Sequence, residues 1–448
     1  MNARDVFRRL WRWFREPLLP GRRSKMNPVD LSFKLFPGGS FGEFNLPKDL
    51  STVLSHGKGS KLYDVFGKEF IDFSLSWGSV ILGHAHPAIT EAVGKQIGRG
   101  SSFSYVNEPA LELAQELHRA IPCAEKIRFA ASGTEATFYA LRFAKAYTGR
   151  TKVLKFEGAY HGAHDIGVTS LFPQKLFPFP TPEFTSAGIS PKVREEVLVG
   201  PYNDLETTQR MIEQSNNEIA CVIMEPLQRC TPPVQGFLEG VRKMTKEGGI
   251  LLIFDEVVTG FRLSYGGAQE YYGVTPDLAA FGKAMGGGFP IGAICGRADI
   301  LDLCTESNLG REKYVWFAST LAGNPISATA SLATLKELRK EGTYERLHSL
   351  GRNLRSGFQT LLKDMGIQGQ VLGDGPLCQV VFTDEKVVDY RGAFRADREK
   401  GRQFALGLFK NGIFLNPMGT KLYLSLAHTE EDIQKILDIS RRVLKEIF

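Results

Sequence analysis

The 448-residue sequence lacks the features that mark membrane-spanning, disulfide-bonded or metal-binding proteins. No apolar run is long enough to cross a bilayer. The six cysteines form no C-x-x-C pair, so the common zinc and redox motifs are absent and we expect no metal. Several cysteines lie in apolar stretches, where a thiol acts as a small hydrophobic group. These absences predict a globular protein of a reducing compartment, which we expect to be the cytoplasm.

The sequence also lacks a charge excess outside its first 26 residues. That segment holds seven arginines and one lysine against two acids, which accounts for the whole net charge of +6. The rest of the chain is balanced, so no basic surface predicts a nucleic-acid partner. Within residues 1–26, apolar side chains recur at helical spacing, at Phe7, Leu10, Trp11 and Phe14.

Three interpretations of the basic segment 1–26 stay open. An amphipathic helix with arginines and aromatic residues can lie weakly on an anionic membrane surface, which would make the protein peripheral to a membrane. A targeting peptide is the second interpretation, although such peptides are usually richer in serine. The third is a terminal helix that packs on the protein's own body or on a neighbouring subunit.

The body of the chain alternates short apolar runs with helical patterns. Residues 219–226 and 250–255 are dense in apolar side chains, as parallel strands buried on both faces are. Helical patterns cover 206–215 and 236–247. This alternation predicts an α/β fold with a mostly parallel central sheet flanked by helices.

From about residue 340 the pattern changes to long amphipathic helices around short strands, which predicts a smaller α+β domain. The expected helices cover 344–365, 395–411 and 429–447, and the expected strands 378–382 and 421–425. We therefore expect four regions: the basic segment 1–26, an N-terminal segment 27–80 that joins the small domain, a large domain 81–335 and the small C-terminal domain 336–448.

Residues 171–192 combine several phenylalanines with five prolines. Prolines interrupt helices and strand ladders, so the composition predicts a long loop. Long loops in compact domains are often lids or binding loops. The alternative is a rigid apolar flap that covers a subunit interface.

The stretch Ser132-Gly133-Thr134 lies between an apolar run at 127–130 and a helical pattern at 135–148. Helix N-termini present free N–H groups that bind phosphate, and a glycine lets the backbone come close to a ligand. Serine and threonine are also ordinary N-cap residues. Taken alone, the motif favours the N-cap interpretation.

Asp255 and Lys283 have surroundings that suit a cofactor. Asp255 ends an apolar run, and parallel sheets bind ligands beyond the carboxyl ends of their strands. A buried carboxylate at that position needs a cationic partner, and a protonated pyridine nitrogen would be one. The alternative is that Asp255 caps the next turn. Lys283 lies among small and apolar residues, which lower the pKa of an amine as a Schiff-base lysine requires. A phosphate contact is the alternative, but the order of a P-loop is absent.

Together these motifs resemble the fold-type I, class III aminotransferases, which use pyridoxal 5′-phosphate (PLP). The chain is most similar to the glutamate-1-semialdehyde 2,1-aminomutase branch, from about Leu35 to the C-terminus. The stretches that carry the resemblance include FPGG (36–39), GHAHP (83–87), SGTEAT (132–137), KFEGAYHG (155–162), FDEVVTGFR (254–262), GKAMGGGFPIGA (282–293) and LAGNPI (321–326).

The resemblance implies a role for each matching residue. Lys283 would bind PLP covalently and move a proton between the substrate's Cα and C4′ of the cofactor. Asp255 would pair with the pyridine nitrogen and keep it cationic. The phosphate would be held by Ser132, Gly133 and Thr134.

Further contacts implied by the resemblance surround the ring. Tyr160, followed by His161, would stack on one face of it, and Val257 would pack against the other. Glu225 would lie near the cofactor. Thr320 would reach the phosphate of the neighbouring subunit, which implies a homodimer.

The substrate side departs from the aminomutase pattern. That branch carries an arginine that grips the substrate carboxylate, and Asn45 occupies its place here. The stretch 416–421 lacks the acid that accompanies this arginine, and Cys230 stands where an asparagine facing the ring hydroxyl is common. Trp77 falls at a pocket-wall position. Lys421 has two interpretations of equal weight. It is either an anion-binding group or a solvated surface lysine.

A carboxylate without its bidentate arginine loses a strong contact. We therefore predict a transaminase that moves an amino group between an amine or amino-acid donor and a carbonyl acceptor, on a non-α or β-amino substrate. The alternative is the aminomutase with a remodelled carboxylate grip. A third hypothesis is a catalytically silent scaffold, against which the intact Lys283, Asp255 and phosphate motif argue.

Overall fold

The computed structural model describes residues 26–42 and 44–448, and the chain divides after Val53 into two units, Met1–Val53 and Leu54–Phe448. The first unit contains α2 (Pro28–Leu35) and the 3-10 turn η1 (Pro37–Gly39). The side chain of Asn27 caps α2 by accepting a hydrogen bond from Val29 N at 2.9 Å. The helix predicted within residues 1–26 falls outside the described residues.

The second unit contains a seven-stranded sheet. Within the described residues, all of its neighbouring strands are parallel except where β10 pairs with β4 and β9. This confirms the predicted mostly parallel α/β sheet. The strand order is β4 (Lys126–Ala130), β10 (Gly292–Gly296), β9 (Leu278–Phe281), β8 (Leu251–Asp255), β7 (Ile219–Met224), β5 (Lys152–Phe156) and β6 (Val197–Gly200).

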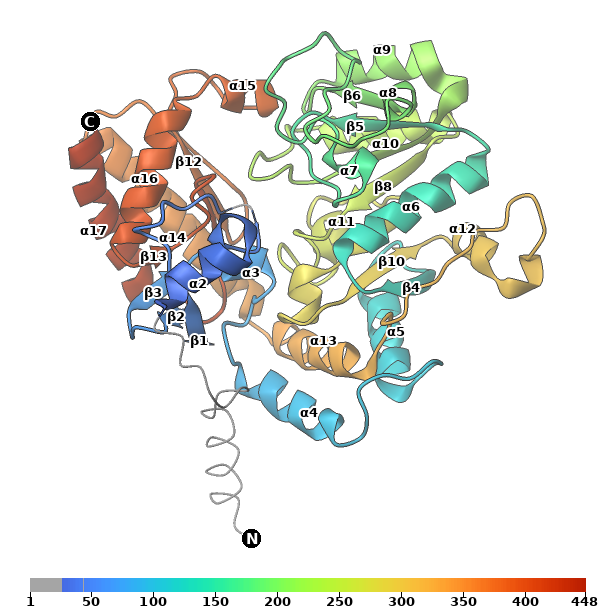
Figure 1. Cartoon of the computed structure of the whole chain (residues 1–448). Helices are drawn as coiled ribbons and strands as arrows, with labels where there is room; N and C mark the ends of the chain where they lie inside the picture. The colour runs from blue at the N-terminus through green and yellow to red at the C-terminus, as the bar shows by residue number, and fades with distance from the viewer. Residues whose placement is uncertain (1–25, 43) are drawn as a thin grey trace. The chain divides into compact units, whose positions relative to one another are not determined.

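Helices cover both faces of this sheet (Figure 1). Alternate residues of β7 belong to two different apolar cores, Val222 to one and Ile223 to the other, because successive side chains of a strand point to opposite faces. The first core includes α10 (Phe237–Glu247), and the second includes α6 (Gly133–Thr148). Burial on both faces explains why β7 and β8 are uninterrupted apolar runs in the sequence.

Two smaller sheets complete the second unit. The strands β11 (Gln370–Leu372), β12 (Leu377–Val381) and β14 (Lys421–Tyr423) form an antiparallel sheet. The strands β1 (Leu54–Lys58), β2 (Lys61–Asp64) and β3 (Glu69–Asp72) are joined by β13 (Ile413–Phe414), which pairs with β3 in parallel. Long helices accompany them: α14 (Thr343–Asp364), α16 (Arg398–Lys410) and α17 (Glu430–Ile447). The domain limits expected at 26, 80 and 335 stay predictions.

The remaining elements connect these sheets. The helices are α3 (Leu75–Gly78), α4 (Pro87–Ile97), α5 (Glu108–Ala120), α7 (Asp165–Val168), α8 (Val193–Glu196), α9 (Leu205–Ser215), α11 (Gly267–Tyr271), α12 (Ala298–Leu301), α13 (Pro325–Leu338) and α15 (Tyr390–Phe394). The 3-10 turns are η2 (Asn216–Glu218), η3 (Lys283–Gly286), η4 (Asp302–Cys304) and η5 (Glu306–Asn308). Among the described residues, no helix combines the length and apolarity that a membrane span needs.

Residues 171–192 contain no helix or strand, as predicted. The loop is fastened by α15. The hydroxyl of Tyr390 donates to the carbonyl of Pro173 at 3.0 Å, and Arg391 donates to the carbonyl of Phe177 at 2.6 Å. The guanidinium of Arg391 also lies 3.8 Å from the ring centre of Phe179. These contacts favour the interpretation of residues 171–192 as a flap that is anchored to α15.

Candidate active site

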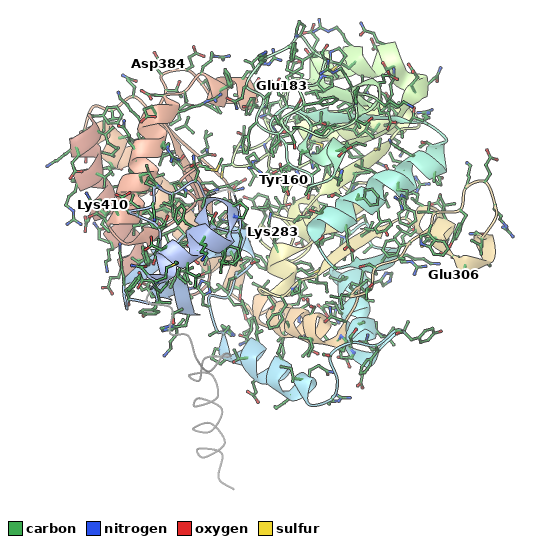
Figure 2. All side chains as sticks on the ribbon, viewed as in Figure 1. Tyr160, Glu183, Lys283, Glu306, Asp384 and Lys410 are labelled. Atoms are coloured by element: carbon green, nitrogen blue, oxygen red, sulfur yellow. The ribbon has the colours of Figure 1, made fainter. Side chains whose placement is uncertain are left out.

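The parallel strands of the large sheet end at one edge, where such sheets bind ligands. Tyr160 and Lys283 both lie at this edge (Figure 2). The strand ends supply Tyr160 and His161 after β5, Glu225 after β7, Asp255 at the end of β8 and Lys283 after β9. The strand-end positions predicted for Glu225 and Asp255 are those of the structure, and Tyr160, His161 and Lys283 follow neighbouring strands of the same sheet.

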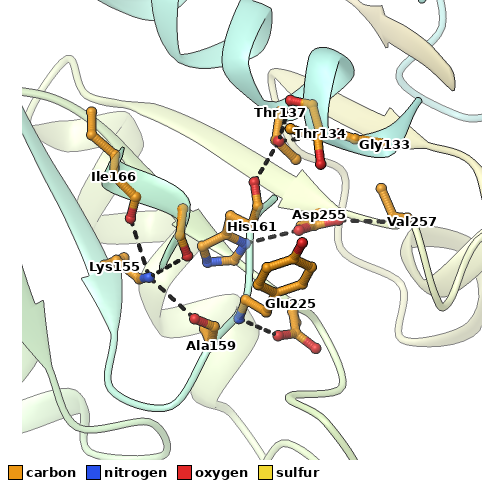
Figure 3. Close-up of polar contacts among 12 residues, drawn as sticks. Gly133, Thr134, Thr137, Lys155, Ala159, His161, Ile166, Glu225, Asp255 and Val257 are labelled. Carbon is orange, nitrogen blue, oxygen red and sulfur yellow. Dashed lines mark hydrogen bonds and ion pairs between the residues drawn. The ribbon is translucent and has the colours of Figure 1, made fainter. Parts of the chain in front are cut away.

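Asp255 is buried and bonded to His161, whose Nδ1 lies 2.8 Å from Oδ2 of the carboxylate (Figure 3). Burial lowers the pKa of His161 to about 3, and the charge of Lys155 adds to this, so the imidazole is neutral and donates from Nδ1. Burial raises the pKa of Asp255 to about 6. The hydrogen bond from the amide of Val257 and the charge of Lys283 oppose this shift. The arrangement leaves a buried carboxylate that a nearby cation would stabilise.

Glu225 fixes the backbone on two sides of the site. Its Oε1 accepts a hydrogen bond from the amide of Tyr160 at 2.9 Å, and its Oε2 accepts one from the amide of Arg229 at 3.0 Å (Figure 3 shows the first). Arg229 adopts a left-handed φ of 59°, which the bond helps to hold. Glu225 therefore positions the turns after β5 and β7.

Lys155 fixes the turn that carries Tyr160 and His161. This lysine is fully buried, and its Nζ lies within hydrogen-bonding distance of four main-chain carbonyls, which its N–H groups share (Figure 3 shows part of this set). The acceptors are Ala159 at 3.1 Å, Ile166 at 3.3 Å, Gly167 at 3.0 Å and Thr169 at 2.6 Å. The turn is therefore built around one side chain of β5.

The N-terminus of α6 has the geometry of an anion site. Ser132 is the N-cap, since its Oγ accepts from the amide of Glu135 at 3.2 Å. Within the described residues, the amides of Gly133 and Thr134 have no recorded acceptor and remain available to a ligand. A Cβ at position 133 would lie 2.7 Å from Cγ1 of Val257, so only glycine fits there.

Lys283 opens η3 with a left-handed φ of 43°. Its side chain is half-buried, and no acceptor for its Nζ is recorded among residues 26–42 and 44–448. Burial lowers the pKa of this amine most; Tyr423 and Asp255 oppose the shift, and the charges of Lys421 and Arg229 add to it. A lowered pKa keeps more of the amine neutral, as a nucleophile or a base requires.

Residues 46–444 match the family described as aminotransferase class-III. The chain belongs to this family. A glutamate-1-semialdehyde 2,1-aminomutase of Thermodesulfovibrio yellowstonii is 40% identical over 423 residues, covering 93% of this chain and 97% of that protein. An omega-transaminase structure from Sphaerobacter thermophilus is 32% identical with a TM-score of 0.87, covering 96% of this chain and 98% of that chain. A transaminase solved with PLP bound is 28% identical with a TM-score of 0.85, covering 94% and 96%.

This class III aminotransferase has the fold-type I architecture and depends on PLP, as predicted. Its own residues fit the cofactor. The unpaired amides of Gly133 and Thr134 suit a phosphate, the buried Asp255 carboxylate suits a cationic ring nitrogen, and the amine of Lys283 suits a covalent link to a carbonyl. The individual contacts of these residues with PLP stay predictions.

The predicted substrate residues are Trp77, Asn45 and Lys421, and Thr320 is the predicted phosphate contact. Trp77 is half-buried in α3, where it and the two preceding residues all have left-handed φ values of 48°, 51° and 59°. Asn45 belongs to the first unit, with a φ of 43°. Thr320 is exposed on the single chain. Lys421 is half-buried and donates to the carbonyl of Arg229 at 2.8 Å, so the solvated-surface interpretation is wrong.

Three residues of this region were missed in the sequence. They are Arg229, Tyr423 and Arg262. The positive charge of Arg229 lowers the pKa values of Lys283 and of the buried Tyr423, and Arg262 is fully buried against Tyr423. Arg229 stands four residues after Glu225, beside the fully buried Cys230 at the expected asparagine place. That neighbourhood was the one signal that could have drawn attention to it.

Proposed function

We propose that this class III enzyme is a glutamate-1-semialdehyde 2,1-aminomutase, which moves an amino group between neighbouring carbons of one substrate. The 40% identity to the Thermodesulfovibrio aminomutase over almost the whole of both chains carries this proposal. The substrate-side departures in the sequence favour a transaminase, with this reaction as the alternative. The relatives' names support the aminomutase more than a transaminase acting on a non-α substrate.

The chain's own residues would divide the work. PLP, when bound, supplies an electron sink for the bond broken at the substrate carbon. Lys283 Nζ would take the proton from that carbon and deliver it to C4′ of the cofactor, and the pKa lowered by burial favours the neutral amine that this needs. Asp255 would pair with the ring nitrogen and keep it cationic, while His161 Nδ1 donates to Oδ2 of the Asp255 carboxylate. The amides of Gly133 and Thr134 would hold the phosphate.

The proposal includes a homodimer in which Thr320 contacts the phosphate site of the second copy. Thr320 is exposed on the single chain, and Trp316 and Leu321 near it are exposed apolar residues, 63% and 50% accessible. Large exposed apolar side chains mark an interaction surface. A dimer in gel filtration, with PLP affinity reduced in Thr320→Ala and subunit association kept, is the expected result.

Transamination between two substrates is the second candidate, and Asn45 favours it. The resemblance puts a carboxylate-gripping arginine at that position, and asparagine cannot provide its bidentate charge-assisted contact. The acid expected within 416–421 is absent as well. Both reactions use the same Lys283 and Asp255.

One experiment separates the two candidates. The holoenzyme is given glutamate-1-semialdehyde alone, and 5-aminolevulinate is measured. Product without an added amino donor supports the aminomutase. Lack of product, together with conversion of the bound cofactor to its amine form by an amino donor, supports the transaminase.

Lys283→Ala tests the shared chemistry. We expect turnover to fall by about 10²- to 10⁴-fold, while Lys435→Ala, an exposed lysine of α17, serves as the control. Full turnover in Lys283→Ala would rule out both candidates.

We also propose weak contact of the basic segment 1–26 with anionic membranes. Its charge and aromatic residues support this. Co-sedimentation with phosphatidylserine vesicles is expected for the full chain and not for a form that starts at Asn27. Equal sedimentation of both forms would remove the proposal.

A further inference from the structure

We propose that Arg229 and Lys421, with the hydroxyl of Tyr423, form the subsite that binds the substrate carboxylate. The inference rests on the proposed amino-group chemistry at Lys283 and names the substrate class: amino or carbonyl compounds whose carboxylate lies away from the reacting carbon. It assigns the carboxylate grip to residues other than the arginine expected at position 45.

Two separate sheets bring these residues together. Arg229 lies on the turn that follows β7 of the large sheet, and Lys421 and Tyr423 lie on β14 of the three-stranded sheet. Residues two apart on a strand point to the same side. The Nζ of Lys421 donates to the carbonyl of Arg229 at 2.8 Å, which ties the turn to the strand.

Both cations lack an acidic partner among the described residues. Arg229 and Lys421 form no recorded ion pair there, and the guanidinium of Arg229 makes only a cation–π contact, 5.4 Å from the ring centre of Phe172. Both residues are half-buried. Charges partly removed from water are costly without a counter-ion. An anion from outside the chain would therefore supply the counter-charge that Arg229 and Lys421 lack.

The reacting amine lies within the electrostatic reach of this pair. Lys421 and Arg229 both depress the pKa of Lys283, after the larger effect of burial. Burial by itself would raise the pKa of Tyr423, but the charges of Lys421, Lys283 and Arg229 outweigh it and lower that pKa. An anion bound by the pair would therefore lie within electrostatic reach of the amine that performs the chemistry.

Tyr423 is fixed so that its hydroxyl can serve this subsite. Two cations lie near its ring, with Lys421 Nζ 4.9 Å and the Arg262 guanidinium 5.5 Å from the ring centre. A Cβ added at Gly78, next to Trp77, would lie 2.6 Å from Cδ1 of Tyr423. The α3 turn therefore packs closely against the Tyr423 ring. No hydrogen bond of the Tyr423 hydroxyl is recorded within the part of the chain that the structure describes, and a carboxylate oxygen would accept one.

Phe172 extends the subsite to the anchored flap. Its ring is the platform for the Arg229 guanidinium, and it belongs to the loop 171–192 that Arg391 of α15 fastens. The guanidinium therefore has one face against an aromatic ring and its N–H edge available for bidentate contact with a carboxylate.

Binding of glutarate to the holoenzyme tests the subsite without any turnover. Calorimetric titration is expected to show glutarate binding that weakens about 10- to 100-fold in Arg229→Gln and in Lys421→Met, since hydrogen bonds to charged groups contribute that much. Arg352→Gln and Lys435→Met replace exposed residues of α14 and α17 and are expected to bind like the unchanged protein. Retention of PLP absorbance and of the melting temperature shows that each variant is folded.

A matched pair of amines adds the link to chemistry. The concentration of 5-aminopentanoate that half-converts the bound cofactor should rise in Arg229→Gln by the same factor, and that of pentylamine should not change. Tyr423→Phe should lower the affinity for glutarate by a smaller factor, about fivefold. Arg229→Lys should bind glutarate more tightly than Arg229→Gln does.

The outcomes distinguish the two proposals. Glutarate binding that is lost in the variants supports the subsite even where no amino-group transfer occurs. Glutarate binding that is unaffected by Arg229→Gln and Lys421→Met overturns it. Inorganic phosphate that binds at this pair in place of glutarate overturns the carboxylate assignment as well.

Discussion

The imidazole Nδ1 of His161 lies 2.8 Å from the Oδ2 of Asp255, with both groups buried. The other oxygen of the carboxylate accepts the amide of Val257 at 3.1 Å. Because the imidazole is neutral, it orients the carboxylate without neutralising its charge, which stays available to the cationic ring nitrogen of PLP.

Asp255→Asn should keep the packing and remove the charge. We expect kcat to fall by about 10²- to 10³-fold, as for the loss of one preorganised electrostatic contact. Steady-state kinetics with saturating PLP measures this. A fall of less than threefold would show that the carboxylate has no role in the reaction.

The raised pKa of Asp255 predicts a pH dependence. The carboxyl binds its proton with a pKa of about 6 in the folded cofactor-free protein, against an ordinary value of 3.8. The folded state therefore holds more protons between these values, and this group's contribution to the free energy of unfolding falls as pH rises from about 4 to 6.

PLP affinity should show the opposite trend. Pairing with a cation needs the ionised carboxylate, so affinity is expected to decrease as pH falls below about 6. Fluorescence titration of the cofactor-free protein from pH 5 to 8 measures it, with Asp255→Asn as the control in which this inflection is missing. An unchanged inflection in the variant would assign it to another group.

Gly133→Ala should displace the phosphate cradle. The added Cβ would lie 2.7 Å from Val257 Cγ1, and overpacking of this kind costs about 1–3 kcal/mol. We expect PLP content after dialysis to drop. Adding Val257→Ala removes the clashing methyl groups and should restore part of the cofactor content; no restoration would mean that the steric explanation is wrong.

Lys155→Met should release the turn that carries Tyr160 and His161. The variant removes the donor of four buried carbonyls, which we expect to lower the free energy of unfolding by about 3 kcal/mol. Urea unfolding measures this. Lys152→Met is the matched control on the same strand, since its pair with Glu218 at 2.9 Å is partly exposed and should contribute at most about 1 kcal/mol.

Arg391→Ala should free the flap 171–192. It removes the ion pair with the buried Glu157, at 2.7 Å, and the contacts with Phe177 and Phe179. Limited proteolysis should cut within 171–192 at a higher rate, and KM should rise more than kcat falls. Arg395→Ala, which breaks an exposed pair with Glu385, should leave the cleavage rate unchanged.

Much of the fold was predictable because its signals are local. The runs 219–226 and 250–255 are apolar on both faces only because helices cover both sides of β7 and β8, and the helical periods after residue 340 locate α14, α16 and α17 within a few residues. The edge that gathers Asp255 and Lys283 follows from the parallel order of the strands.

The parts that the sequence did not reveal depend on distant contacts. Lys155 is one lysine in an apolar strand until the turn after it folds back and presents its carbonyls. Arg229 and Lys421 are 192 positions apart, and nothing in either local stretch indicates that the two sheets meet there. Asn45 and Thr320 were chosen by resemblance, and their roles stay predictions.

The parallel pairing of β13 with β3 sets the order in which the protein can be completed during synthesis. Ile71 is synthesised early, and its strand partner Ile413 is synthesised much later. Lys421 and Tyr423 are synthesised after Ile413. The strands that hold Asp255 and Lys283 are therefore made well before the proposed carboxylate subsite exists. A chain that stops short of β14 contains Asp255, Lys283 and Arg229 and lacks Lys421 and Tyr423, so the proposed subsite needs the last strand to be made.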